Sequence, residues 1–306
     1  MGARVAVSLE ELMMLKADAR GFSLLPRQPV GSLLAGRHAS RLRGRGLSFE
    51  ELRQYRPGDD IRTMDWKATA RLRSPQVRVY AEERERPVLL VVDQRQTMFF
   101  GSQLTMKSVA AAELAALGAW KALDAGDRVG GLVFNDNEVV EVRPHRSQTR
   151  VLQLLHEVVR LNQELTVAHP PSVSVTLNQT LERALQIAKH DHLVVLISDL
   201  DGADDSTARL AARLASHNDV LVAAVYDPLG ASLIGSPGML ASDRGRMWEM
   251  GNSASFSEDF QASFQQRLDE WRDIFHALRV PLLPISAARP VPEQVRALFG
   301  HRPRKA

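Results

Sequence analysis

Two acidic residues stand at the ends of short apolar runs, where they could bind a cation or a partner. Residues 88–92 are all Val or Leu and lead into Asp93, and residues 193–197 are equally apolar and lead toward Asp199. Such runs are typical of strands that are buried on both faces of a parallel sheet. Ligands bind where the carboxyl ends of these strands meet. We therefore expect Asp93 and Asp199 to lie close together.

Hydroxyl groups near these acids would complete an oxygen site for a hard cation such as Mg²⁺. Thr97 follows Asp93, and Thr180 opens the helix that is predicted before the second acidic strand. Arg95 lies between Asp93 and Thr97, and its positive charge opposes a bound cation. Because like charges repel strongly at short range in a low dielectric, we predict that Arg95 replaces the cation and leaves a metal-free site. In the alternative, Arg95 turns outward to an acidic partner and Mg²⁺ binds through Asp93, Thr97, Thr180 and Asp199.

The remaining pattern predicts an α/β fold. Strands are expected at 88–92, 128–134, 138–142, 192–198, 219–226 and 281–285, and helices at 104–124, 147–161, 180–189, 205–216 and 257–278. This alternation predicts a doubly wound, mostly parallel sheet with helices on both faces. Asn135-Asp136-Asn137 predicts a hairpin turn, and residues 229–256 a loop or small hairpin. We divide the chain into an accessory region, residues 1–86, with a helix, an Arg-rich loop over 22–46 and short strands, and a main domain, residues 87–306.

The composition excludes several kinds of site. The 306 residues include no cysteine, which excludes disulfides, thiol catalysis, iron–sulfur clusters and cysteine-ligated zinc. No apolar run approaches the roughly 20 residues that span a bilayer, and the first residues lack a secretory signal. We therefore predict a cytoplasmic protein without a membrane span.

Positive charge is concentrated in the first third of the chain. Residues 1–90 hold 17 Lys and Arg against 11 Asp and Glu, whereas the rest of the chain is net acidic. An auxiliary basic surface is predicted at Arg37, Arg41, Arg43 and Arg45. Its alternatives are a solvated loop or a site for nucleic acid, whose binding would weaken steeply with salt. The acidic remainder and the missing RNA-recognition motifs argue against nucleic acid. We expect Trp66, beside Lys67 and Arg71, to be packed rather than to be a stacking platform.

Catalytic signatures are missing from the sequence. There is no phosphate-binding G-x-x-x-x-G-K-[ST] and no H-E-x-x-H, and residues 251–255 do not complete G-x-S-x-G. We therefore predict a protein that is not an enzyme. A Mg²⁺-dependent hydrolase using Asp93 and Asp199 is the alternative, and it has no assigned general base.

The acidic constellation resembles the metal-ion-dependent adhesion site of von Willebrand factor A domains. In that site a strand ends in Asp-x-Ser-x-Ser, and later loops supply a Thr and an Asp. Asp93, Thr97, Thr180 and Asp199 match these positions, and Arg95 occupies the place of the first Ser. The resemblance therefore implies a degenerate adhesion site.

A longer pattern runs through Tyr55-Arg56-Pro57-Gly58-Asp59-Asp60 and residues 65–71, and it includes residues 44–49, 83–87, 226–229 and 281–285. In these segments the chain resembles the domain-of-unknown-function 58 family, in its shorter, membrane-free form. The resemblance implies a von Willebrand A-like domain that acts with a MoxR-type AAA+ ATPase. Its expected role is that of an adaptor in the assembly or remodelling of other proteins.

Overall fold

The structure, a computed structural model, describes residues 3–21, 47–82, 86–166, 175–228, 240–243, 246–249, 269 and 271–299. The chain divides into a main unit, residues 1–31 and 86–306, and a small unit, residues 32–85. The sequence analysis placed residues 1–86 in one accessory region. The structure instead assigns the N-terminal segment to the main unit, because Val7 and Leu12 are buried in its core.

A six-stranded sheet forms the centre of the main unit, in the order β10-β7-β6-β3-β4-β5. Its strands are β3 (Pro87–Asp93), β4 (Arg128–Phe134), β5 (Val139–His145), β6 (Leu193–Ser198), β7 (Asp219–Tyr226) and β10 (Leu282–Ser286). All neighbours are parallel except β4 and β5. The chain builds outward from β3 through β4 and β5 and then resumes beside β3 with β6. This reversal is the topological switch point of a doubly wound sheet, so the predicted fold class is confirmed.

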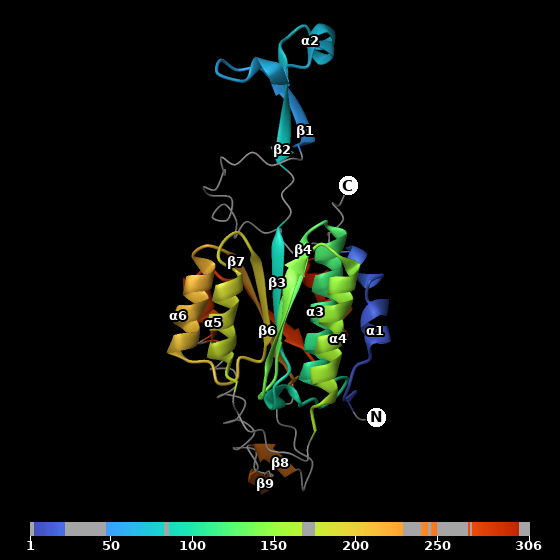
Figure 1. Cartoon of the computed structure of the whole chain (residues 1–306), viewed down its shortest axis with the longest axis vertical. Helices are drawn as coiled ribbons and strands as arrows, with labels where there is room; N and C mark the ends of the chain where they lie inside the picture. The colour runs from blue at the N-terminus through green and yellow to red at the C-terminus, as the bar shows by residue number, and fades with distance from the viewer. Residues whose placement is uncertain are drawn as a thin grey trace. The chain divides into compact units, whose positions relative to one another are not determined.

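Helices cover both faces of the sheet (Figure 1). Helices α3 (Lys107–Asp124), α4 (Gln148–Gln163) and α9 (Val291–Phe299) pack on one face. The other face carries α5 (Leu177–Ile187), α6 (Asp205–Ala215) and helical residues 271–277. Because side chains alternate along a strand, Leu90 joins the first core and Leu89 the second. No described helix is long and apolar enough to cross a membrane.

The N-terminal segment is fixed to the main unit by hydrogen bonds as well as by burial. Helix α1 (Leu9–Met14) begins at a capping box of Ser8 and Glu11, and a 3-10 turn, η1 (Asp18–Gly21), follows it. The indole Nε1 of Trp120 donates to the carbonyl of Leu12 (2.9 Å). The amide of Val7 donates to Oδ1 of Asn162 (3.0 Å). These bonds connect the segment to α3 and α4.

The two predicted hairpins lie at the predicted places. Strands β4 and β5 are antiparallel, and Oδ1 of Asn135 accepts hydrogen bonds from the amides of Asn137 and Glu138 (both 2.9 Å) in the turn. Strands β8 (Leu240–Asp243) and β9 (Arg246–Glu249) pair within the segment 229–256. Helix α9 was not predicted.

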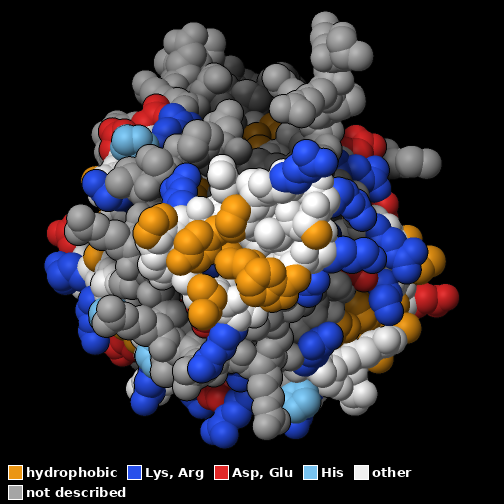
Figure 2. Space-filling model, turned by 90° about the horizontal axis from the view of Figure 1, so that it is seen from above, with side chains coloured by type: hydrophobic (Ala, Val, Ile, Leu, Met, Phe, Trp, Pro, Cys, Tyr) orange, Lys and Arg blue, Asp and Glu red, His pale blue; other side chains and the backbone are white. Residues whose placement is uncertain are grey.

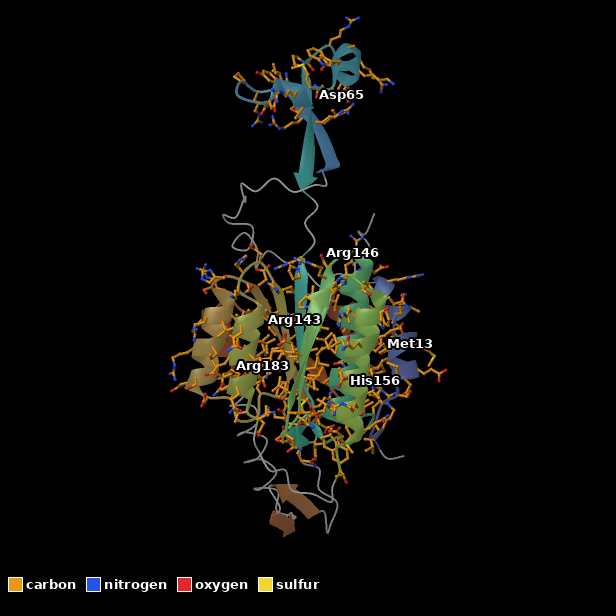
Figure 3. The ribbon with its side chains drawn as sticks, in the orientation of Figure 1. Met13, Asp65, Arg143, Arg146, His156 and Arg183 are labelled. Carbon is orange, nitrogen blue, oxygen red and sulfur yellow. The ribbon has the colours of Figure 1, made fainter. Side chains whose placement is uncertain are left out.

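The small unit is a two-stranded ribbon with short helices. Strands β1 (Leu47–Gln54) and β2 (Gln76–Glu82) pair antiparallel, and η2 (Ile61–Thr63) and α2 (Trp66–Leu72) lie between them in sequence. The acids of this segment serve turns and caps, since Asp59 and Asp60 accept backbone amides and Asp65 (Figure 3) caps α2.

Two ion pairs hold the ribbon of the small unit to its connecting segment. Asp59 pairs with Arg53 and Asp65 with Arg78. Trp66 was expected to be packed, yet 70% of its surface is exposed.

Candidate functional site

Asp93 and Arg95 form a buried ion pair at the end of β3. The Arg95 guanidinium donates from Nε to both carboxylate oxygens of Asp93 (3.0 and 3.1 Å) and from Nη2 to Oδ2 (2.7 Å). The backbone amide of Arg95 donates to Oδ1 (2.9 Å), and the hydroxyl of Ser198, at the end of β6, donates to Oδ2 (2.6 Å). Both oxygens of Asp93 are therefore held by protein donors, as burial of a carboxylate requires.

Asp199 is neutralised by a second cation. Nζ of Lys107, the first residue of α3, lies 2.6 Å from Oδ2 of Asp199. The other oxygen accepts the amide of Asp201 (3.0 Å) and lies 3.7 Å from Nη2 of Arg95. Asp93 and Asp199 lie close together, as expected, since Arg95 contacts both. Their two negative charges are balanced by Arg95 and Lys107.

We call Asp93, Arg95, Lys107, Ser198 and Asp199 the charged cluster. The pKa shifts of Asp199 and Arg95 indicate the charge states of these two members. Burial alone would raise the pKa of Asp199, but attraction to Lys107 and then Arg95 lowers it below the usual value. Burial disfavours the charged form of Arg95 as well, yet Asp93 and Asp199 raise its pKa above the usual range. Both residues are therefore ionised at neutral pH.

Arg95 points into the protein. Only 8% of its side chain is exposed, and its guanidinium carbon lies 5.5 Å from the centre of the Phe134 ring. Nη2 also donates to the carbonyl of Asp201 (3.1 Å). Arg95 therefore contacts both acids from within the protein and does not turn outward.

The two predicted threonines lie in different surroundings. Thr97 is in the 3-10 turn η3 (Gln96–Met98), directly after Arg95, and its Oγ1 is buried with no hydrogen-bond partner among the described residues. Thr180 lies inside α5 rather than at its start, and its hydroxyl donates to the carbonyl of Thr176 (3.2 Å). No described contact joins Thr180 to Asp93 or Asp199. The structure therefore brings Asp93, Arg95 and Asp199 together but leaves Thr180 out.

Helix α5 begins earlier than predicted because Thr176 and Gln179 form a capping box. Thr176 is exposed, and the neighbouring amide of Val175 donates to the carbonyl of Asp136 (3.0 Å). Asp136 in turn accepts the amide of Gln96 (2.6 Å). Burial raises the pKa of Asp136, against the opposing effect of the Gln96 amide. The loops before η3 and α5 are thus connected through Asp136.

Two members of the charged cluster were missed by the sequence analysis. Ser198 directly precedes Asp199, and its place at the end of a buried strand was a readable signal. Lys107 is 92 residues from Asp199 in sequence, and nothing in its local pattern indicates the pairing.

These residues do not fit a divalent cation. A bound Mg²⁺ requires carboxylate oxygens as ligands, but the oxygens of Asp93 and Asp199 already accept hydrogen bonds from Arg95, Ser198 and Lys107. Among the described residues, no group of three or more His, Asp or Glu is arranged to hold a metal ion. The unpartnered Oγ1 of Thr97 is the one predicted ligand that a bound group could still use.

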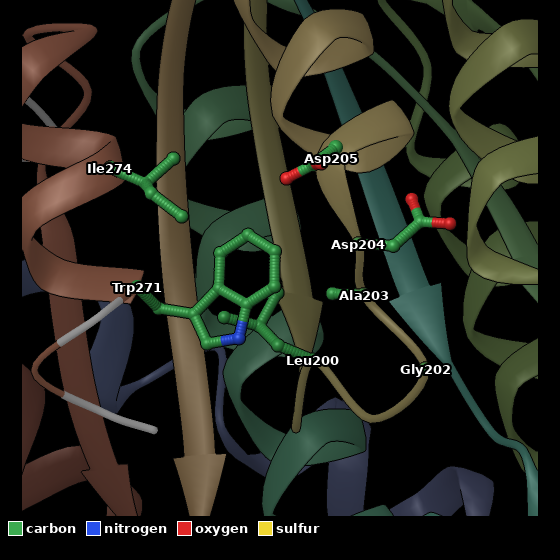
Figure 4. Close-up of a pocket in the computed structure, with 7 residues that line it drawn as sticks. All are labelled: Leu200, Gly202, Ala203, Asp204, Asp205, Trp271 and Ile274. Carbon is green, nitrogen blue, oxygen red and sulfur yellow. The ribbon is translucent and has the colours of Figure 1, made fainter. Parts of the chain in front are cut away.

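A cavity of about 390 Å³ lies beside the charged cluster, lined by Leu200, Gly202, Ala203, Asp204, Asp205, Trp271 and Ile274. The indole of Trp271 lies beside Leu200 and Ala203, and the carboxylate of Asp204 points away from it (Figure 4). The cavity shares a loop with the cluster, because a Cβ on Gly202 would lie 3.9 Å from Nη1 of Arg95.

The loop between β6 and α6 is held in an uncommon conformation. Leu200 has φ +59°, a region that few residues other than glycine adopt, and Gly202 has φ +72°. The amide of Leu200 donates to the hydroxyl of Ser198 (3.0 Å). The charged cluster and this bond therefore determine the shape of one cavity wall.

The predicted basic surface of Arg37, Arg41, Arg43 and Arg45 lies outside the described residues.

The fold and the site define a doubly wound α/β domain with a charge-balanced cluster at its switch point. The chain belongs to the family described as protein of unknown function DUF58, whose model matches residues 51–269. This confirms the family that the sequence motifs indicated.

Relatives and solved structures were also found. Uncharacterized proteins of Mycobacterium bovis (Mb1516) and Mycobacterium tuberculosis (Rv1480) are each 28% identical over 278 residues, which cover 90% of this chain and 86% of theirs. The conserved hypothetical protein BatB from Bacteroides thetaiotaomicron has a TM-score of 0.39 at 12% identity, covering 69% of this chain and 97% of BatB. The VWA domain of SpRpn10 has a TM-score of 0.38 at 11% identity, covering 69% of this chain and 94% of that domain.

Proposed function

We propose that this protein is a non-enzymatic interaction module that binds a partner protein at the carboxyl edge of its sheet without a metal ion. The observation that carries the proposal is the charged cluster, in which Arg95 occupies the position between two acids that a cation would otherwise take. A buried pair of acids that is neutralised internally stays fixed in charge and geometry when no ligand is bound. Such a cluster supports a preformed binding edge.

Groups suited to contact a partner lie around the cluster. The hydroxyl of Thr97 has no hydrogen-bond partner among the described residues, and a buried polar group left unpaired costs about 1 to 3 kcal/mol. Because Oγ1 is buried in the unbound protein, the η3 turn would shift to admit a donor or acceptor from the partner, and that contact would remove the cost. The adjacent cavity is lined by the Trp271 indole and by Asp205, which a side chain of the partner could contact. Aromatic groups of this kind often anchor protein interfaces.

The geometry of the cluster supports a binding role over a hydrolytic one. Ser198 is the nucleophilic residue of the cluster, but it is fully buried and donates its proton to Asp93. Among the described residues no histidine contacts it. An activated nucleophile needs a free neighbouring base and access to substrate, but Ser198 has no access and the carboxylate beside it is held by Arg95.

The proposed partner is a MoxR-type AAA+ ATPase, which the protein would serve as an adaptor in protein assembly or remodelling. This choice rests on membership of the family, since members are typically encoded beside such ATPases. We propose a cytoplasmic location for the complex.

The proposal is tested by capturing the tagged full chain from its native cells, with and without a chelator, and identifying bound proteins by mass spectrometry. We expect a MoxR-type ATPase in both samples, because no metal ion bridges the partners. Thr97→Val should lower its recovery strongly while raising the thermal stability of the free protein, since it removes a buried hydroxyl that makes no internal hydrogen bond.

A matched control is Thr180→Val, which also removes one hydroxyl but inside α5. It should retain the ATPase. Loss of the ATPase on chelation would contradict the metal-free site, and equal recovery with Thr97→Val and wild type would contradict the proposed edge. Absence of any such ATPase would contradict the adaptor role.

A further inference from the structure

The small unit exposes large apolar side chains close together in sequence. Ile61, Trp66 and Leu72 are 65%, 70% and 58% exposed. All three lie in η2 and α2, and in the space-filling view of Figure 2 hydrophobic side chains gather in one group bordered by Lys and Arg. Single exposed apolar residues are normal, but a gathered group marks an interaction surface.

Four cations accompany this group, namely Arg62, Lys67, Arg71 and Arg73. All four are exposed, and no hydrogen bond or ion pair joins their side chains to other residues in the described part of the chain. Arg53 and Arg78 of the same unit, by contrast, pair with Asp59 and Asp65. Asp59 and Asp65 are therefore already engaged, and the four cations stay available to an external anion.

Two of these cations, Lys67 and Arg71, are spaced so that they destabilise helix α2. Lys67 and Arg71 are four residues apart on α2, so their like charges face each other on its surface and destabilise it by a few tenths of a kcal/mol. An anionic surface that binds both would remove this repulsion.

We propose that Ile61, Trp66 and Leu72 with these four cations form a surface, the α2 surface, that binds the anionic lipid headgroups of a membrane. Trp and aliphatic residues set among Lys and Arg are typical of protein segments that lie in the headgroup layer. Positive charge is attracted to anionic lipids at roughly 1 kcal/mol per Lys or Arg. The α2 surface supplies both contributions.

The apolar members favour lipid over other anionic partners. Single-stranded nucleic acid stacks its bases on aromatic rings, and Trp66 alone could serve, whereas Ile61 and Leu72 have no ring. An acidic protein would need a surface shaped to the exposed Trp66, whereas a headgroup layer adapts to any convex group. The α2 surface lies in a different unit from the charged cluster, so this inference stands apart from the proposed function.

The test is co-sedimentation of the full chain with phosphatidylcholine vesicles that contain or lack phosphatidylserine. We expect binding that requires phosphatidylserine and weakens as ionic strength rises, because salt screens exposed charges. Lys67→Ala with Arg71→Ala should weaken binding roughly 25-fold, at about fivefold for each cation removed. Trp66→Ala with Leu72→Ala should weaken it roughly tenfold or more.

The matched control is Lys189→Ala with Arg213→Ala, which removes two exposed cations from the main unit and should leave vesicle binding unchanged. Thermal unfolding of each variant checks that it folds, which is expected for substitutions at exposed positions. Failure to bind phosphatidylserine vesicles overturns the proposal, as does binding that neither double variant weakens. Binding of a single-stranded oligonucleotide that Lys67→Ala with Arg71→Ala abolishes, without vesicle binding, would assign the surface to nucleic acid instead.

Discussion

Nζ of Lys107 lies 2.6 Å from a carboxylate oxygen of Asp199, and both side chains are largely buried. The pair connects the first turn of α3 to the loop after β6. Together with Arg95 it balances the charges within the charged cluster, whose four charged groups are buried or nearly so.

Lys107→Met tests how much this pair stabilises the fold. Removing one partner of a buried pair leaves an uncompensated charge and typically costs about 3 to 5 kcal/mol. We expect a loss of about 3 kcal/mol in the free energy of unfolding, measured by urea denaturation, because Arg95 still lies near Asp199. Lys107→Met with Asp199→Asn should recover most of it. A single variant within about 0.5 kcal/mol of wild type would show that Lys107 contributes little.

Lowering the pH should reduce the free energy of unfolding over a defined pH range, through protonation of Asp199. The pKa of Asp199 is lowered in the fold by Lys107 and Arg95 in spite of burial. A lowered carboxyl pKa gives stability that is present above the unfolded-state value, about 3.9, and is lost as pH falls through the folded-state value. Unfolding free energy should therefore drop below about pH 4 in the wild type, and less steeply in Lys107→Met with Asp199→Asn.

The pKa of Asp136 is shifted in the opposite direction to that of Asp199. Burial raises its pKa in the fold, so the folded state takes up a proton there more readily than the unfolded state. Asp136→Asn should raise the free energy of unfolding at neutral pH and flatten its dependence between the unfolded and folded pKa values, as followed by urea denaturation over a pH series. Unchanged stability at neutral pH would mean that Asp136 is not costly when ionised.

Arg95→Ser tests whether the guanidinium occupies a cation's place. The substitution frees the oxygens of Asp93 and creates the hydroxyl that the adhesion-site pattern carries at this position. We expect the variant to bind Mg²⁺ measurably by isothermal titration calorimetry and the wild type not to. Arg95→Ser with Asp93→Asn is the control, since it lacks the first acid. A Mg²⁺ affinity of Arg95→Ser equal to that of the wild type would contradict the proposal that Arg95 replaces the cation.

Leu12→Ala tests whether the N-terminal segment belongs to the main unit. Leu12 is fully buried, and removal of such a side chain costs about 2 to 5 kcal/mol. Met14→Ala, two residues on, alters a side chain that is 64% exposed and should change stability by less than about 0.5 kcal/mol. Both are measured by chemical denaturation. Equal effects of the two would contradict the packing of α1 on α3 and α4.

Local patterns predicted the central sheet well because its strands are apolar on both faces. The bounds of β4 and β7 agree with the prediction to the residue, since charged or turn residues stand directly outside each run. Asp93 and Asp199 were predicted to meet for the same reason.

The site was predicted less completely, and the reasons differ by residue. Thr180 was placed at a helix start, although Thr176 and Gln179 carry the capping-box spacing that begins α5 three residues earlier. Lys107 was missed because its partner is distant in sequence and only the folded sheet brings them together. Trp66 was expected to be packed because large aromatics usually are, and no local pattern indicates that it is exposed.

The small unit interrupts the main unit in sequence, so parts of the main unit that pack together are synthesised at different times. The amide of Val7 bonds to Asn162, 155 residues later, and the small unit is translated between them. At roughly 5 to 20 residues per second, the ribosome needs about 8 to 30 s to deliver the helix that receives the first residues. During that interval the segment that holds Leu12 lacks part of the surface on which it packs, because α4 has not yet been synthesised.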